Sequence, residues 1–311
     1  MEGIIIKEGI NPDFIIELTQ EDGRDLKSIK KPELYKKEFR DKYNRLDKND
    51  LSWNFLNKKN VILSIFYNKE KVNSSDLQVI ENDVIKCEAG SSIGKQILYN
   101  TNLAITKGGV YIKFKYMNKI YLVCSVHLPI DTKSEDMGND NRIKCLEKIM
   151  TKLSEISSDV DFLILGGDLN FRNIAPEVCD TQSKCTNDQF NIYVMNKNNK
   201  DKFKIANLEI IEQPNNANKL ENKLVNTCKF KSEKDSGMGP IEYSDCRLSK
   251  NQSNKKCFDE KRKPSTCDRI LFGHSSTINV SQPIYESVVI SSELDHNAVI
   301  TLYELTSKSP Q

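Results

Sequence analysis

The chain of 311 residues is long enough to bury a substantial hydrophobic core, and it suits one large domain or two small ones. Charged residues make up 29% of it and hydrophobic residues 38%, and its formal net charge of +2 excludes a histone-like polycation. The first residues hold too short an apolar run for a signal sequence, and no stretch approaches the roughly 20 apolar residues that span a bilayer. The sequence therefore predicts a soluble, cytoplasmic protein.

Apolar, β-rich runs recur along the chain, and they predict strands at residues 13–18, 61–67, 110–116, 120–128, 161–167, 269–273, 285–291 and 298–305. Between two of them, residues 139–158 repeat their apolar side chains at helical intervals. Strands and helices are mixed without the strict alternation of a doubly wound sheet, which favours a layered α/β or α+β domain with antiparallel pairs. The sequence has no internal repeat and no clean linker, so we expect a single domain over residues 1–311.

The segment 110–128 predicts two strands around a short turn at 117–119. Its second strand is almost continuously apolar, which is typical of a strand buried on both faces, and it ends at His127. From about 173 to 263 the chain becomes polar and rich in Asn, Lys and Ser, and the segments QPNNANKLENK (213–223) and KNQSNKK (250–256) are predicted loops.

Nine cysteines lie scattered between Cys87 and Cys267, with no C-x-x-C pair and therefore no zinc-ligand spacing. Reduced thiols in a cytosol-like compartment are expected ahead of disulfides. Cys179 and Cys185 are the alternative, because they could close a small loop.

Chemically active side chains lie at the ends of several predicted strands. Each alone would be an ordinary cap, turn or structural histidine, but two of the three histidines fall at such places. Together they suit a divalent metal with a phosphate substrate: hard oxygens hold Mg²⁺, a carboxylate takes a proton from water, and imidazoles bond phosphoryl oxygens. The residues are Glu21, His127, Asp168 and Asn170 after strands, and Asp295 and His296 before the last one.

Two of these residues, Asp168 and Asn170, lie in the run FLILGGDLNF (162–171). Its apolar half predicts a buried strand, and its two glycines allow backbone or substrate to approach closely. If the period of two continues, Asp168 and Asn170 point to one side while Leu169 and Phe171 turn towards the packing.

Seven motifs carry a family resemblance in a consistent order along the chain. The longest are ILGGDLNFR (164–172) and KRKPSTCDRILF (261–272). The shorter ones are PDFIIELTQE (12–21), KGGVYIKF (107–114), VCSVHLP (123–129), NTCKF (226–230) and LDHNAV (294–299). They resemble the signatures of the inositol polyphosphate 5-phosphatases, which include W-x-G-D-x-N-Y/F-R and K-R-x-P-x-W-C-D-R-I/V-L. The resemblance covers nearly the whole chain.

This resemblance implies the deoxyribonuclease I-like fold of the endonuclease/exonuclease/phosphatase superfamily, an α+β protein built as a four-layer α/β sandwich of two packed mixed β-sheets flanked by helices. It also implies a Mg²⁺ cofactor bound by Glu21. Asp168 would be the general base for the attacking water, and Asn170 would orient both water and phosphate.

The remaining catalytic residues are implied in the same way. His296 would clamp the transferring phosphoryl group while Asp268 holds its imidazole in the correct tautomer. Asp295 would be a further acidic ligand or orienter beside the metal, and His127 would bind the scissile phosphate from the other side. The implied reaction is in-line attack of water on phosphorus, without a covalent enzyme intermediate.

A ring bearing several phosphates needs further cations, and Lys229, Lys261 and Arg262 match family positions that grip the neighbouring ring phosphate. Two aromatic residues of the family pattern are missing, since Cys228 replaces a Tyr and Thr266 a Trp. These departures bear on the choice of inositol substrate rather than on the reaction.

The family's first strand, with its T-W-N-type motif, has no counterpart before Glu21. Asn54, in LSWNF, follows Glu21 and is therefore out of order. The expectation is either that the strand lies upstream of Met1 or that the metal site is depleted.

The leading hypothesis is a Mg²⁺-dependent 5-phosphatase of phosphoinositides, soluble inositol polyphosphates, or both. The alternatives are a nuclease or other phosphodiesterase of the superfamily, and a catalytically impaired phosphoinositide-binding module. We expect a monomer without a nucleic-acid partner, located in the cytoplasm. Any contact with anionic membranes is expected to be peripheral.

Overall fold

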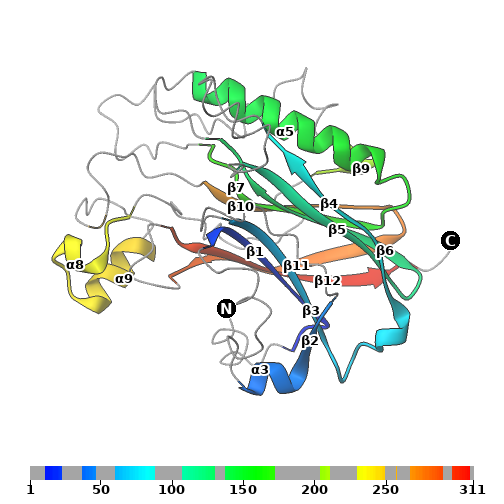
Figure 1. Cartoon of the computed structure of the whole chain (residues 1–311). Helices are drawn as coiled ribbons and strands as arrows, with labels where there is room; N and C mark the ends of the chain where they lie inside the picture. The colour runs from blue at the N-terminus through cyan, green and yellow to red at the C-terminus, as the bar shows by residue number, and fades with distance from the viewer. Residues whose placement is uncertain are drawn as a thin grey trace. The chain divides into compact units, whose positions relative to one another are not determined.

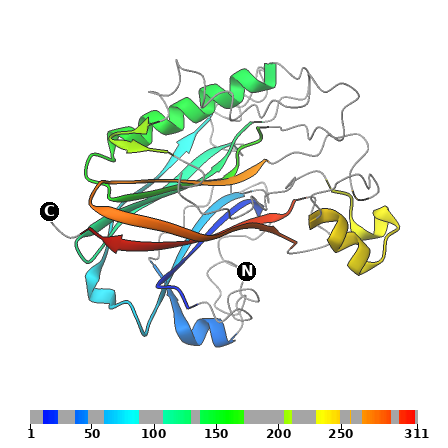
Figure 2. The same cartoon turned by 180° about the vertical axis from the view of Figure 1, so that it is seen from behind.

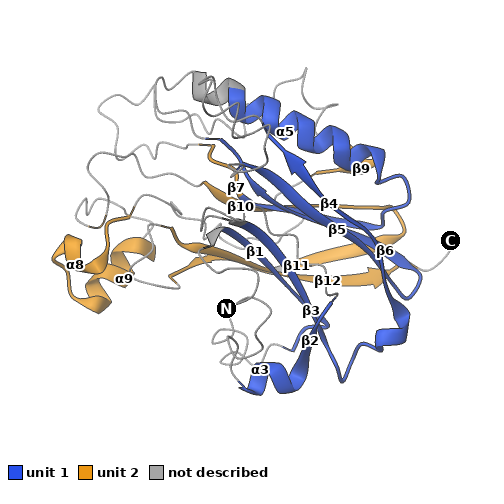
Figure 3. Cartoon of the chain, viewed as in Figure 1, with its two compact units in different colours: residues 1–167 blue, residues 168–311 orange. Residues whose placement is uncertain are grey.

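The computed structural model describes residues 11–22, 37–46, 60–87, 107–129, 137–171, 204–210, 230–248, 257, 267–289 and 296–308 (Figure 1). The chain divides into two compact units, Met1–Gly167 and Asp168–Gln311, coloured separately in Figure 3. The single domain expected from the sequence stays a prediction, and each unit is described by itself.

One sheet of unit 1 consists of β1 (Phe14–Asp22), β3 (Asn60–Asn68) and β2 (Tyr43–Arg45), in that order and antiparallel. The short helix α3 (Lys37–Lys42) precedes β2. An aromatic cluster joins the helix to the sheet, because Phe39 stacks on Tyr43 and meets Phe66 edge-on. This cluster fixes the outer end of the sheet.

The other strands of unit 1 lie side by side in the order β7 (Phe162–Asp168), β6 (Lys119–His127), β5 (Gly108–Tyr116) and β4 (Leu77–Lys86). The 3₁₀ turn η2 (Ser74–Asp76) leads into β4, and the helix α5 (Met137–Glu155) packs on β4 and β5. Strand β3 contacts β5 and β6, so the two sheets of unit 1 pack face to face. Strands β5, β6 and β7 together supply more buried apolar residues than the other strands of unit 1.

Unit 2 contains a long antiparallel pair, β11 (Ile278–Val288) with β12 (Ala298–Ser307), which Figure 2 shows from behind. Strand β10 (Asp268–His274) contacts β12 and the small hairpin of β8 (Lys204–Ile205) and β9 (Leu208–Glu209). Helices α8 (Glu233–Ser236) and α9 (Pro240–Leu248) follow the hairpin in sequence. The rings of Phe272 and Tyr303 lie 4.9 Å apart in the core of this unit.

Mixed sheets with few helices confirm the predicted α+β class. The strands predicted at 61–67, 110–116, 120–128, 161–167, 269–273 and 298–305 are all present, and the predicted helix is α5. Helices α8 and α9 were not predicted, and the two predicted loops, 213–223 and 250–256, lie outside the described residues. The sequence does not predict these two helices, because most of their residues are polar and only a few of their side chains are buried.

Among the described residues, four cysteines form two disulfides, Cys87–Cys145 and Cys246–Cys257, which corrects the expectation of reduced thiols. The partners are 58 and 11 residues apart in sequence, so spacing alone did not reveal them. Cys179 and Cys185 lie outside the described residues. Structural disulfides persist in oxidising compartments and are rare in the cytosol, so they weigh against the cytoplasmic location, which stays a prediction. Among the described helices, none is both long and apolar enough to cross a membrane.

Candidate active site

In unit 1 the ends of β1, β6 and β7 converge on Gly167. This glycine has φ +133°, and a Cβ placed on it would lie 2.1 Å from the carbonyl oxygen of Val126 and 2.7 Å from Nε2 of Gln20. The same Gln20 amide donates a hydrogen bond of 3.2 Å to Ser125 Oγ. The close backbone approach expected of the glycine pair is therefore to a neighbouring strand, and it occurs at Gly167.

Glu21, the predicted metal ligand, lies near the end of β1. Thr19 pairs with Ile62 and Asp22 with Asn60, so β1 contains one extra residue between these pairs. Such a bulge bends a strand and re-aims its side chains, and bulges are common beside active sites. The Glu21 side chain itself lies outside the described part of the structure.

His127 ends β6 and is almost completely buried. Its backbone pairs with Gly108, and the ammonium group of Lys107 contacts its Nε2 atom. The sequence reasoning did not select Lys107 as a site residue. The signal that could have found it is the hairpin register, which pairs the residue after Lys107 with His127.

In unit 2, Asp168 and Asn170 are both buried, at 5% and 1% exposure. The backbone N–H of Asn170 donates to Asp168 Oδ1 at 3.0 Å. Asn170 has φ +53°, so the extended strand does not continue through it, and the predicted period of two is wrong here. An asparagine tolerates this left-handed conformation better than most residues, and the tight turn places both polar groups together.

The second part of this site is the pair formed by Asp268, the first residue of β10, and His296. Asp268 Oδ2 lies 2.9 Å from Nδ1 of His296, and their side chains are 14% and 25% exposed. The backbone N–H of Leu169 donates to the carbonyl of Cys267 at 2.8 Å. This bond joins the turn of residues 168–170, called here the Asp168 turn, to the residue directly before Asp268. The structure therefore brings the motifs around Asp168 and Asp268 together.

Such a carboxylate–imidazole pair fixes which ring nitrogen bears the proton, so the other nitrogen can bond a substrate oxygen. The buried carboxylate of Asp168 supplies a second acid–base group. The pair and the Asp168 turn thus provide the kinds of groups that transfer a proton from water and stabilise charge on a phosphoryl group.

The described residues include no group of three His, Cys, Asp or Glu side chains that could hold a metal ion. The carboxylate of Asp168 and the amide of Asn170 are hard oxygen donors of the kind that Mg²⁺ prefers. They fit a metal site only with further carboxylates, and neither the Glu21 side chain nor Asp295 is described.

The remaining predicted residues, Lys229, Lys261 and Arg262, also lie outside the described residues, as does Asn54. The roles of all the site residues stay predictions. One residue that the sequence reasoning missed, Arg247 of α9, donates to the carbonyl of His296 at 2.7 Å.

The sequence matches the model of the endonuclease/exonuclease/phosphatase family 2 over residues 12–302. A search of curated proteins gives no match to the sequence. Members of the wider superfamily are hydrolases that use divalent metals.

Solved structures with the deoxyribonuclease I-like fold resemble the chain. Cimex nitrophorin in its ferrous NO complex is 18% identical with a TM-score of 0.57, and the match covers 97% of this chain and 90% of that one. The inositol polyphosphate 5-phosphatase domain of SPsynaptojanin, with inositol (1,4)-bisphosphate and calcium, is 17% identical with a TM-score of 0.56, covering 96% and 77%. At these identities the likeness shows the fold alone, and the two proteins illustrate that this fold does not decide function.

The match to the family model is of a different kind, because it covers the sequence from before Glu21 to beyond His296. The chain therefore belongs to the endonuclease/exonuclease/phosphatase family 2.

Proposed function

We propose that the chain is a Mg²⁺-dependent phosphatase that removes the 5-phosphate from inositol polyphosphates and phosphoinositides. The observation that carries the proposal is the 2.9 Å pair of Asp268 and His296, held next to the Asp168 turn by the bond between Leu169 and Cys267. The motifs GDLNFR and KRKPSTCDRIL resemble those of the 5-phosphatases and supply the substrate class.

In the proposed reaction the oxygen of a water molecule attacks phosphorus, and the bond between phosphorus and the inositol oxygen breaks. Asp168 accepts a proton from the water, and Asn170 orients it. The leaving inositol oxygen takes up a proton, so the products are an inositol hydroxyl and inorganic phosphate. His296, oriented by Asp268, bonds an oxygen of the phosphoryl group as its charge changes.

His127 has a supporting role in this proposal, as a donor to the scissile phosphate. Glu21 and Asp295 would hold Mg²⁺, which when bound supplies Lewis-acid stabilisation of charge on the phosphate oxygens. Lys229, Lys261 and Arg262 would bind the adjacent ring phosphate, Arg262 in a bidentate fashion. Cys228 and Thr266 replace aromatic residues, so we expect a looser ring pocket than in 5-phosphatases that carry the aromatic pair.

The test is release of inorganic phosphate by the full chain from inositol 1,4,5-trisphosphate and from vesicles containing phosphatidylinositol 4,5-bisphosphate. The proposal predicts release with Mg²⁺, loss of release with a chelator, and loss in Asp168→Asn. Asp76→Asn is the matched control, since Asp76 is an exposed carboxylate in η2. We expect it to keep at least half of the activity.

The two substrates separate a soluble from a lipid preference. Nicking of plasmid DNA without phosphate release would replace the proposal by the nuclease alternative. Binding of the vesicles without turnover, unchanged by chelator, would replace it by the binding module.

A further inference from the structure

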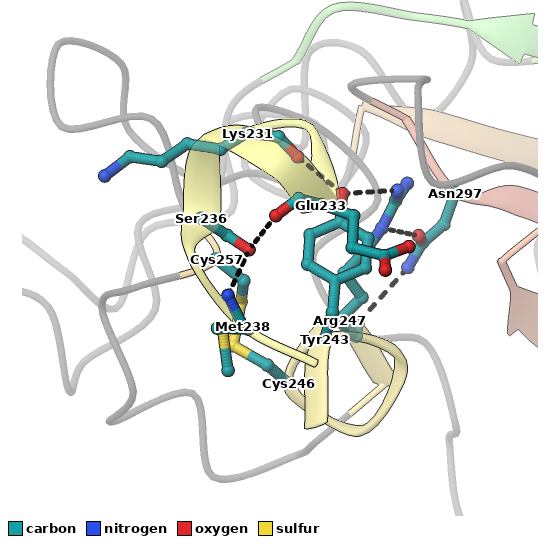
Figure 4. The surroundings of a disulfide bond; sticks show 9 residues. All are labelled: Lys231, Glu233, Ser236, Met238, Tyr243, Cys246, Arg247, Cys257 and Asn297. Atoms are coloured by element: carbon teal, nitrogen blue, oxygen red, sulfur yellow. Dashed lines mark hydrogen bonds between the residues drawn. A yellow bond between two sulfur atoms is a disulfide. The ribbon is translucent and has the colours of Figure 1, made fainter. Parts of the chain in front are cut away.

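Arg247 lies in α9, and its side chain is completely buried. The guanidinium donates from Nε to Asn297 Oδ1 at 2.8 Å, from Nη1 to Tyr243 Oη at 3.0 Å and from Nη2 to the carbonyl of His296 at 2.7 Å. Figure 4 shows the first two of these bonds. Three donors of one rigid fork thus reach three different acceptors, which a flexible Lys ammonium cannot reproduce in the same geometry.

Aromatic rings cover the same guanidinium. Its Cζ atom lies 4.4 Å from the ring centroid of Phe230 and 5.4 Å from that of Tyr243. Cation–π contacts of this kind are strongest where water is excluded. These hydrogen bonds and ring contacts hold the buried guanidinium in one orientation. Arg247 is therefore a fixed structural residue rather than a surface cation.

The contact between Arg247 and Asn297 is reciprocal. Asn297 Nδ2 donates back to the carbonyl oxygen of Arg247 at 3.2 Å. His296 is consequently held at two places, its ring by Asp268 and its backbone by Arg247. The position of the imidazole depends on both contacts. Even with one ring nitrogen bonded to Asp268, a shift of the His296 backbone would move the ring.

We propose that Arg247 is a positioning residue for His296, a proposal that rests on the function proposed above. Arg247 contacts no reacting atom in this scheme. It sets where the imidazole stands relative to the phosphoryl group, and a misplacement of about 1 Å can lower a catalytic rate by about 100-fold. Loss of Arg247 should therefore lower kcat and leave KM nearly unchanged.

The same helix is fastened to the segment that follows Lys229. Tyr243 Oη donates to the carbonyl of Lys231, and the N–H of Lys231 donates to the carbonyl of Cys257 at 2.9 Å. The Cys246–Cys257 disulfide, next to Arg247 in the chain, closes this arrangement (Figure 4). Helix α9, which holds His296 through Arg247, is thus linked covalently to residue 257 by the disulfide. This link explains how a helix of nine residues can keep a buried charge in place.

The experiment uses the full chain with Arg247→Lys, Arg247→Met and Glu242→Gln, the last being an exposed control on the same helix. Thermal unfolding identifies the variants that remain folded at the assay temperature. We expect kcat to fall at least tenfold in both Arg247 variants, less in Lys than in Met, with KM within threefold of wild type. Glu242→Gln should stay within twofold in both constants.

A cycle with His296→Gln separates positioning from a general loss of structure. If Arg247 acts through the imidazole, Arg247→Lys should change kcat by less than twofold once His296 is replaced. An equal loss of kcat in both backgrounds would overturn the proposal, as would an Arg247→Met variant with wild-type kcat.

A second readout does not depend on turnover. The chain has three histidines, so their ring Cε1–Hε1 signals can be assigned by NMR at one fixed pH. We expect the His296 signal to shift or broaden in Arg247→Lys while the His274 signal stays in place. An unmoved His296 signal in a folded variant would overturn the proposal. If wild type releases no phosphate, the proposed function fails, but a shifted His296 signal still supports the placement by Arg247.

Discussion

Replacing Gly167 by Ala tests the convergence of strands that delivers Asp168. At φ +133° a residue with a side chain is strained by about 1–3 kcal/mol. The new Cβ would also lie 2.1 Å from the Val126 carbonyl oxygen, about 1.3 Å closer than the 3.4 Å where ordinary contact begins. Overpacking in a core costs about 1–3 kcal/mol more, so we expect the free energy of unfolding to fall by at least about 2 kcal/mol.

Two other glycines are matched controls for this prediction. Gly237 has φ +66° with nothing within 4 Å of an added Cβ, so Gly237→Ala should cost about 1–2 kcal/mol from strain alone. Gly239 has open space and no such strain, and Gly239→Ala should stay within about 0.5 kcal/mol. Urea unfolding of the three variants measures the series. A Gly167→Ala protein no less stable than Gly237→Ala would contradict a close contact between the added Cβ and the Val126 carbonyl.

Three further predictions follow from single side chains. Asp268→Asn should lower kcat by about 10²–10⁴-fold with little change in KM, because the amide no longer holds the correct tautomer of His296; steady-state kinetics within threefold of wild type would contradict this. Burial, reinforced by Asp161, raises the pKa of Tyr121 to about 12, whereas the unfolded value is about 10. The stability that comes from keeping the Tyr121 hydroxyl neutral in the folded state is therefore present below pH 10 and lost as the pH rises towards 12. Measured by urea unfolding, the free energy of unfolding of Tyr121→Phe should fall less over that interval than that of wild type. Burial also raises the pKa of the Cys124 thiol, so at pH 8 iodoacetamide should modify it only in urea, and peptide mapping that finds it alkylated in the native protein would oppose this.

The sequence was sufficient to predict the elements whose side chains follow a strong apolar pattern. Strands β5, β6 and β7 are buried along most of their length, so continuous apolar runs predict them. Strand β4 was not predicted, because most of its residues are partly exposed and its polar side chains break the alternation. Helix α9 was hidden for a similar reason, since only three of its nine residues are buried.

For the candidate site, local motifs identified individual residues but predicted their geometry less well. The Asp268–His296 contact followed from a family motif, and the structure places those side chains together. The left-handed turn at Asn170 was missed, because a period of two assumes that the strand continues. Arg247 carried no local signal at all, since its contact with residue 296 joins positions 49 apart in sequence. The disulfides escaped for the same reason, as their partners meet only in the folded chain.

The proposed activity of the chain is hydrolysis of the 5-phosphate of an inositol ring. The most direct measurement is ³¹P NMR of inositol 1,4,5-trisphosphate incubated with the full chain and Mg²⁺, with His296→Gln in parallel. We expect inorganic phosphate and inositol 1,4-bisphosphate from wild type, and at least 100-fold slower formation from the variant. An unchanged substrate, or a product that has lost the 4-phosphate instead, would contradict it.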